Sequence, residues 1–209
     1  MELALWLPFF AAAWAISLSP GAGAVAAMSA GLNHGFRRGY FISFGLVAGI
    51  MTQIVVISAG LGALIAASTL AFAAVKWGGV AYLVWLGLKQ WRAPTEPMLA
   101  EAAGGDARVS RRSLMLRGWM INAVNPKGTV FLLAVVPQFL DTARPLLGQY
   151  LAIAATLVFT DLVVMAGYTV LAARLLKYLR APGHLRLLNR VFGSLFMLAG
   201  VLLATFKRA

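Results

Sequence analysis

Long uncharged apolar runs alternate with short basic segments along this chain. No Asp, Glu, Lys or Arg occurs from Leu3 to Phe36, a run of 34 residues, and a second apolar stretch extends from Gly39 to Leu88 with Lys76 as its single charge. About 20 apolar residues suffice for a helix to cross the hydrocarbon core of a bilayer. The first run therefore predicts one long membrane helix, and the second predicts two helices with a tight turn near residues 66–70.

The second half of the chain repeats this pattern after a polar interval. Residues 89–117 contain prolines, a glycine pair and several arginines but few large apolar side chains, and they predict a solvated loop. Further apolar runs follow at 118–136, 146–172 and 191–206. The pattern predicts an all-α integral membrane protein in which six transmembrane helices form a single domain, 1–209.

The composition supports a membrane protein and excludes several other classes. Of 209 residues, 61% are apolar and 11% are charged, whereas soluble domains carry about 25% charged residues. The net charge is +12, but the basic residues form short clusters between apolar runs and offer no continuous face to a phosphate backbone. We therefore expect no nucleic-acid partner. The sequence has no cysteine, which excludes disulfides and thiolate metal sites, and we expect no cofactor.

The distribution of Lys and Arg predicts how the chain is oriented. The connections after helices one, three and five carry thirteen of these residues, and the other loops and termini carry three. Cytoplasmic loops of membrane proteins are enriched in Lys and Arg. We expect these three connections to face the cytoplasm and both termini to lie outside.

Two of the predicted helices contain a motif that interrupts helical geometry. Helix one carries Ser19-Pro20-Gly21, and helix four carries Asn125-Pro126-Lys127. Proline removes a backbone donor and clashes with the preceding turn, and a neighbouring glycine lowers the cost of leaving the helix. We expect the first helix to be broken at Pro20 and the fourth at Pro126, near the middle of the membrane.

The two breaks occupy equivalent places in the two halves of the chain. Each half has three predicted helices, so the second half must be inserted with the opposite orientation. The pattern predicts two inverted three-helix repeats, at about 1–90 and 118–209. Broken helices at matching positions of inverted repeats are typical of transporters whose substrate site lies between the repeats.

The two motifs, the six helices and the length of 209 residues resemble the lysine exporter (LysE) family, in particular its homoserine and threonine efflux (RhtB) branch. The resemblance covers the whole chain. Family members often have a second proline after Pro-Gly, where this chain has Ala22, and this departure leaves the geometry of the first break open. The resemblance implies export of small neutral amino acids or derivatives by proton antiport across a bacterial inner membrane.

Asp161 is the single acid within the predicted membrane helices. A carboxylate at that depth is costly, so it should face the bundle interior, be protonated or be paired. In one interpretation Asp161 forms a fixed pair with Lys127 that ties helices four and five together. In the other, Asp161 binds the substrate ammonium or alternates between substrate and proton, while Lys127 and backbone amides at the breaks hold the substrate carboxylate.

The predicted substrate and coupling site therefore combines both breaks with helix five: Ser19, Pro20, Gly21, Asn125, Pro126, Lys127 and Asp161. Other polar membrane residues could line a cavity or only join helices: Gln53, Asn122, Thr160 and Tyr168. Tyr168 could equally be an anchor at the membrane interface. Small-residue spacings at Gly31-xxx-Gly35-xxx-Gly39 and Gly45-xxx-Gly49 allow close helix contact, either within the bundle or in a homodimer.

Other functions fit the sequence less well. A metal exporter would need thiolate or imidazole ligands, and the membrane helices contain neither. A membrane enzyme would need clustered acids or histidines, so we expect no enzyme and no resident metal. An exporter of another small solute, either a basic amino acid or a metal ion, and a non-coupled channel stay open as alternatives. The predicted partners are a small amino acid, protons and the lipid bilayer.

Overall fold

The computed structural model describes residues 2–67, 69–92, 109–141 and 143–179, with residues 186, 187, 190, 191, 193, 194, 197, 198, 201 and 204. The described residues form α-helices and one short 3-10 helix, and no strand occurs among them. The prediction of an all-α protein is confirmed.

The chain follows one helix after another with short connections. In order, the elements are α1 (Leu3–Leu18), α2 (Ala22–Gly39), α3 (Phe41–Ala67), α4 (Thr69–Trp91), α5 (Arg111–Ala123), α6 (Pro126–Val135), η1 (Val136–Phe139) and α7 (Leu146–Leu179). The boundary between α3 and α4 falls inside the turn predicted at residues 66–70. The predicted helix at 191–206 lies largely outside the described residues, and those of its residues that the structure does describe are helical.

Four segments have the length and polarity of membrane spans. Phe41–Gly60 of α3 and Leu146–Arg174 of α7 qualify alone. Two helix pairs qualify together, α1 with α2 and α5 with α6 and η1, and each pair is bent by 54° at its break. The described part of the chain thus contains two candidate spans, or up to four if each bent pair counts as one. The full set of six helices stays a prediction.

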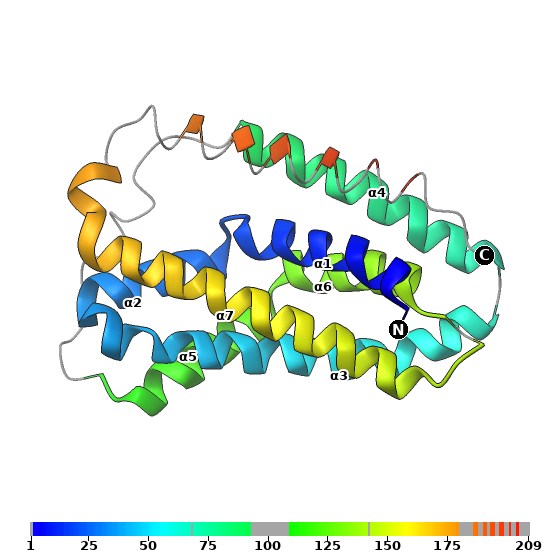
Figure 1. The fold of residues 1–209 in the computed structure, drawn as a ribbon, viewed down its shortest axis with the longest axis horizontal. Coiled ribbons are helices and arrows are strands. Elements are labelled where there is room, and N and C mark those ends of the chain that lie inside the picture. The colour runs from blue at the N-terminus through cyan, green and yellow to red at the C-terminus, as the bar shows by residue number, and fades with distance from the viewer. Residues whose placement is uncertain are drawn as a thin grey trace.

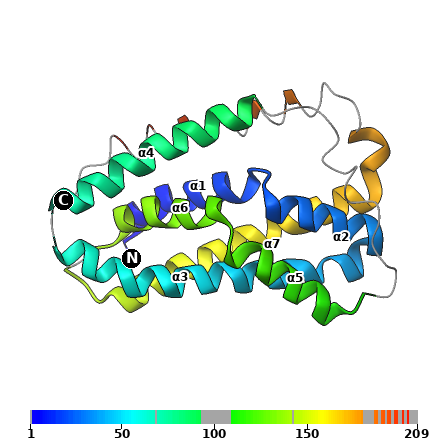
Figure 2. The same ribbon diagram turned by 180° about the vertical axis from the view of Figure 1, so that it is seen from behind.

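The two bent pairs run in opposite directions along the bundle. In Figure 1 the α1–α2 pair runs from right to left, and the α5–α6 pair runs from left to right beside it. Figure 2 shows the same arrangement from behind, with both breaks near the middle of the bundle. The ends of α2 and α7 and the start of α5 lie at one end of the molecule (Figure 1). These three segments carry exposed arginines, Arg37, Arg38, Arg111, Arg112 and Arg174.

Glycines allow the closest helix crossing, which joins α3 to α5. A Cβ atom on Gly45 would meet the carbonyl oxygen of Met115 at 1.8 Å, and a Cβ on Gly118 would meet that of Ile42 at 2.3 Å. The backbones of α3 and α5 therefore touch at Gly45 and Gly118, which have no side chains. Gly49 of α3 continues this contact toward Ala123.

A second close crossing joins α2 to α7. A Cβ on Gly31 would lie 2.4 Å from the carbonyl oxygen of Thr169. Gly35 does not make the close helix contact that its spacing predicts, because a Cβ there would meet nothing within 4 Å. Its φ of 67° lies in the left-handed region, and α2 bends at this residue. The structure therefore places the contacts of Gly31, Gly45 and Gly49 within the bundle.

The helices extend beyond the boundaries that composition suggests. We predicted a solvated loop over 89–117, but α4 continues to Trp91 and α5 begins at Arg111, while residues 93–108 lie outside the described set. Ser110 explains the early start of α5, because its Oγ accepts a hydrogen bond of 3.1 Å from the backbone N–H of Ser113 and caps the helix. The arginines of this first turn, Arg111 and Arg112, are exposed and belong to α5 rather than to a loop.

Candidate functional site

The first break separates α1 from α2 and exposes the carbonyl groups at the end of α1. Pro20 has no backbone N–H, and Ser19 and Gly21 have extended geometry. The carbonyl of Leu18 accepts a hydrogen bond of 2.6 Å from the hydroxyl of Tyr168. The carbonyl of Ser19 accepts one of 2.7 Å from Lys127 Nζ. Side chains from later helices thus satisfy both carbonyl groups.

The second break is built around Asn125, which caps α6. Its Oδ1 accepts a hydrogen bond of 3.1 Å from the backbone N–H of Lys127, and Pro126 occupies the first helical position, where no donor is needed. Asn125 Nδ2 donates to Asn122 Oδ1 at 3.0 Å, and Asn122 Nδ2 donates to the carbonyl of Leu46 at 2.8 Å. This chain of amides ties the break to α3.

Gln53 of α3 holds the same break from the other side. Its Nε2 lies 2.8 Å from the carbonyl oxygen of Asn122, 3.0 Å from that of Asn125 and 2.9 Å from Thr129 Oγ1. All three acceptors lie at or next to the interruption between α5 and α6. Gln53 therefore satisfies backbone groups that the break would otherwise leave without a partner.

Lys127 connects the two breaks. It comes from the start of α6, and its Nζ reaches the end of α1 across the gap between the pairs. A Cβ atom on Gly21 would lie 3.3 Å from both Cδ and Nζ of Lys127. The glycine therefore leaves the room that the lysine side chain occupies. The positive ammonium also complements the negative dipole end of α1.

Asp161 lies buried in the middle of α7, with 7% of its surface exposed. The preceding residue, Thr160, shares a hydrogen bond of 3.2 Å with Ser17 of α1, which fixes this part of α7 against the first break. Asp161 Oδ2 is buried and has no hydrogen-bond partner among the described residues.

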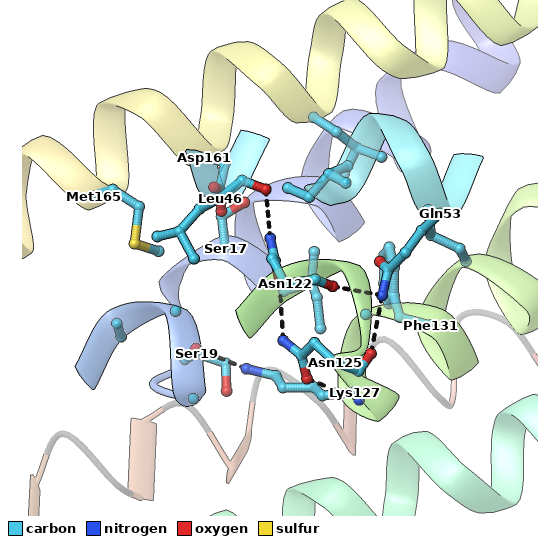
Figure 3. Close-up of a pocket in the computed structure, with 18 residues that line it drawn as sticks. Ser17, Ser19, Leu46, Gln53, Asn122, Asn125, Lys127, Phe131, Asp161 and Met165 are labelled. Carbon is cyan, nitrogen blue, oxygen red and sulfur yellow. Dashed lines mark hydrogen bonds between the residues drawn. The ribbon is translucent and has the colours of Figure 1, made fainter. Parts of the chain in front are cut away.

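These residues surround one cavity between the two breaks (Figure 3). The space between its lining residues, with its open mouth included, is about 580 Å³. Polar groups and glycines from α1, α2, α3, α5, α6 and α7 line it beside an apolar wall. The lining residues are Ile16, Ser17, Ser19, Gly21, Gly23, Ala24, Leu46, Ile50, Gln53, Asn122, Asn125, Lys127, Gly128, Phe131, Leu132, Leu157, Asp161 and Met165.

Three polar atoms of this lining are buried without a hydrogen-bond partner in the described structure: Ser19 Oγ, Gln53 Oε1 and Asp161 Oδ2. Buried polar atoms are nearly always paired, because an unmade hydrogen bond costs about 1–3 kcal/mol. All three atoms can accept a hydrogen bond; the serine hydroxyl can also donate one, and so can the aspartate when it is protonated. The cavity therefore suits a ligand that carries hydrogen-bond donors.

The predicted site residues separate into two groups. Five of them line the cavity together: Ser19, Gly21, Asn125, Lys127 and Asp161. The prolines do not line it. Pro20 lies between the two helices of the first pair, and Pro126 begins α6 with its ring exposed, so both act by breaking the helix.

The less specific polar candidates divide in the same way. Gln53 and Asn122 line the cavity, whereas Thr160 and Tyr168 support its walls through hydrogen bonds to α1. Sequence reasoning did not single out Ser17 or the apolar lining. The described residues contain no group of three or more His, Cys, Asp or Glu side chains that could hold a metal ion.

The chain is similar to known translocators and efflux proteins. The family described as LysE type translocator matches residues 14–206. A homoserine/homoserine lactone efflux protein of Salmonella typhimurium is 42% identical over 209 residues, which is 100% of both chains. An uncharacterized membrane protein of Vibrio cholerae is 42% identical over 207 residues, 99% of this chain and 100% of the other. A leucine efflux protein of Enterobacter sp. is 30% identical over 190 residues, 88% of each chain. No solved structure shows a significant match.

Proposed function

Because this chain belongs to the LysE family of translocators, we propose that it exports small neutral amino acids or their derivatives, of the threonine and homoserine kind, in exchange for protons. One observation carries the proposal: the cavity between the breaks holds a buried acid and a partly buried lysine beside the ends of broken helices. The names of similar proteins support efflux of homoserine, its lactone and leucine. The chain is a transporter, as predicted, rather than an enzyme.

The carboxylate of an amino acid fits the side of the cavity formed by the first break. Lys127 Nζ and Ser19 Oγ supply donors there. The N-terminus of α2 adds to them, because Gly21 at its N-cap provides no side-chain cap and Gly23 and Ala24 line the cavity. Backbone N–H groups and the positive dipole end of a helix favour an anion.

The ammonium group of the same substrate fits Asp161. Its buried Oδ2 accepts no hydrogen bond from the described residues, and a substrate ammonium would supply one that is strengthened by charge. Binding would also neutralise a carboxylate in a low-dielectric region. A zwitterion therefore matches the acid and the base of the cavity together.

Proton coupling follows from the same carboxylate. Asp161 can be neutralised either by the ammonium of a substrate or by a proton, and in this proposal one replaces the other. An outward step would then carry the amino acid, and the return step would carry a proton on Asp161. This assignment favours the functional carboxylate over a merely structural pair with Lys127.

The proposed placement in the membrane rests on the arrangement of the helices. The bent pairs run in opposite directions, as two inverted repeats at about 1–90 and 118–209 require (Figure 1). The helix ends that carry arginines share one end of the bundle, and this supports a cytoplasmic position for that end. We place the protein in the bacterial inner membrane with both termini outside.

Proton flux in proteoliposomes tests the proposal. Vesicles that contain a pH-sensitive dye are challenged with threonine, homoserine, leucine and lysine, with cadmium as a control. We compare wild type with Asp161→Asn and with Thr169→Val. Thr169 is a matched control, because it is buried on the same helix and its hydroxyl bonds only to the carbonyl of Met165 in the structure.

We expect neutral amino acids to drive proton flux in wild type and in Thr169→Val but not in Asp161→Asn. Full proton-coupled flux in Asp161→Asn would remove Asp161 from the mechanism. Amino-acid movement without proton movement in wild type would indicate a channel or uniporter. Flux with lysine alone or with cadmium alone would identify a different exported solute and contradict the proposal.

A further inference from the structure

We propose that Gln53 Oε1 accepts a hydrogen bond from a hydroxyl group on the substrate side chain, so that the cavity favours hydroxy amino acids over aliphatic ones of the same length. The inference rests on the proposed function, because it concerns the same cavity. It assigns a specificity-determining role to a residue outside both break motifs.

The amide of Gln53 is held in one orientation. Its nitrogen faces two carbonyl oxygens and a hydroxyl at 2.8–3.0 Å, which only an N–H group can satisfy. The oxygen therefore points away from these groups. It is buried, in a residue with 4% of its surface exposed, and no described residue donates to it.

Gly128 leaves room for this oxygen because it has no side chain. A Cβ atom on Gly128 would lie 2.8 Å from Gln53 Oε1, and both residues line the cavity. Any larger residue at position 128 would press against this acceptor. The fixed nitrogen and the absent side chain together leave one buried neutral acceptor on a residue that lines the cavity.

The charge of the cavity decides which donor this acceptor receives. An ammonium prefers a carboxylate, because hydrogen bonds between ions are about twice as strong as neutral ones. In the proposed function Asp161 takes the ammonium and Lys127 takes the carboxylate. In Figure 3 Gln53 and Asp161 stand on different sides of Asn122, so the amide lies away from the acid. The neutral acceptor then remains for an uncharged donor on the substrate side chain, such as the hydroxyl of homoserine or threonine.

A purely structural role makes a different prediction. Gln53 Nε2 holds the second break, and its loss would weaken transport of every substrate equally. Thr129 is one of the three groups that this nitrogen contacts, and it does not line the cavity. A Thr129→Val variant therefore removes one hydrogen-bond partner of Gln53 Nε2 but leaves the acceptor Oε1 unchanged.

The experiment compares two substrates that differ by one hydroxyl group, homoserine and 2-aminobutyrate. The transport kcat/KM of each is measured in proteoliposomes for wild type, Gln53→Met and Thr129→Val. Methionine is unbranched and similar in size to glutamine but offers no comparable acceptor. An unpaired buried acceptor costs about 1–3 kcal/mol, which corresponds to a preference of roughly 5- to 150-fold.

We expect wild type and Thr129→Val to prefer homoserine by at least about fivefold, and Gln53→Met to transport both substrates equally well. A homoserine preference that survives in Gln53→Met, or falls as far in Thr129→Val, would overturn the inference. If Gln53→Met does not fold, equal transport of the two substrates by wild type would still overturn it. Failure of wild type to transport either substrate would instead count against the proposed function.

Discussion

The backbone contact between α3 and α5 predicts that a single methyl group at Gly45 destabilises the protein. In Gly45→Ala the new Cβ would lie 1.8 Å from the carbonyl oxygen of Met115, whereas ordinary contacts begin at 3.4 Å. The two helices would have to separate by about 1.6 Å, and neither side of the contact is a flexible side chain. Overpacking of this kind costs about 1–3 kcal/mol, and we expect the upper part of that range.

The assay is thermal unfolding of the purified protein in detergent. A loss of about 2–3 kcal/mol corresponds to a decrease of roughly 4–12 °C in Tm for a chain of this size. Gly60→Ala is the matched control, because Gly60 lies in the same helix and a Cβ there would meet nothing within 4 Å. Its Tm should stay the same or increase, since alanine favours a helix.

A double variant provides a stricter test. Gly118→Ala acts on the same crossing, with its Cβ at 2.3 Å from the carbonyl oxygen of Ile42. The separation that Gly45→Ala imposes would already relieve this second clash. The double variant should therefore lose little more stability than Gly45→Ala alone. Its total loss should be smaller than the sum of the losses of the two single variants. Equal Tm values for Gly45→Ala and Gly60→Ala, or full additivity in the double variant, would refute the crossing.

Three further substitutions, at two residues, test the hydrogen bonds at the breaks. Tyr168→Phe should lower stability by about 1–3 kcal/mol, because the carbonyl of Leu18 loses its 2.6 Å donor, and an unchanged Tm would show that another donor replaces it. Asn125→Ala removes the helix cap and should lower stability by about 0.5–2 kcal/mol. Asn125→Asp keeps a capping oxygen for the Lys127 N–H and should lower stability less. Equal losses in the two variants would show that the hydrogen bond to Asn122 matters more than the cap.

The breaks could be predicted from sequence because their cause is local. Proline at positions 20 and 126 removes a donor whatever surrounds it, and the structure interrupts the helices at both places. The predicted start of α5 was wrong because the polar composition of residues 89–117 received more weight than a local signal, the N-cap residue Ser110. Ser110 caps α5, and the helix therefore includes three arginines, Arg111, Arg112 and Arg117.

The partners of the site residues could not be predicted in the same way. Opposite charge suggested Asp161 as the partner of Lys127, but the lysine also donates to the Ser19 carbonyl. Every residue has a backbone carbonyl, so a sequence does not indicate which one a side chain will bind. Gln53 contacts atoms 69 to 76 positions away. Only the packing of α3 on α5 brings Gln53 close to these atoms. No periodicity in the sequence indicates which residues so far apart along the chain will meet.

The glycine crossings also bear on how a substrate could pass through the protein. The two most extensive helix contacts, α3 with α5 and α2 with α7, lie in the half of the bundle where the arginines end the helices. Backbone atoms meet directly at both crossings, at Gly45 and Gly118 and at Gly31. A movement that separates either helix pair must therefore break these contacts, and a side chain at any of the three positions would favour the separated arrangement.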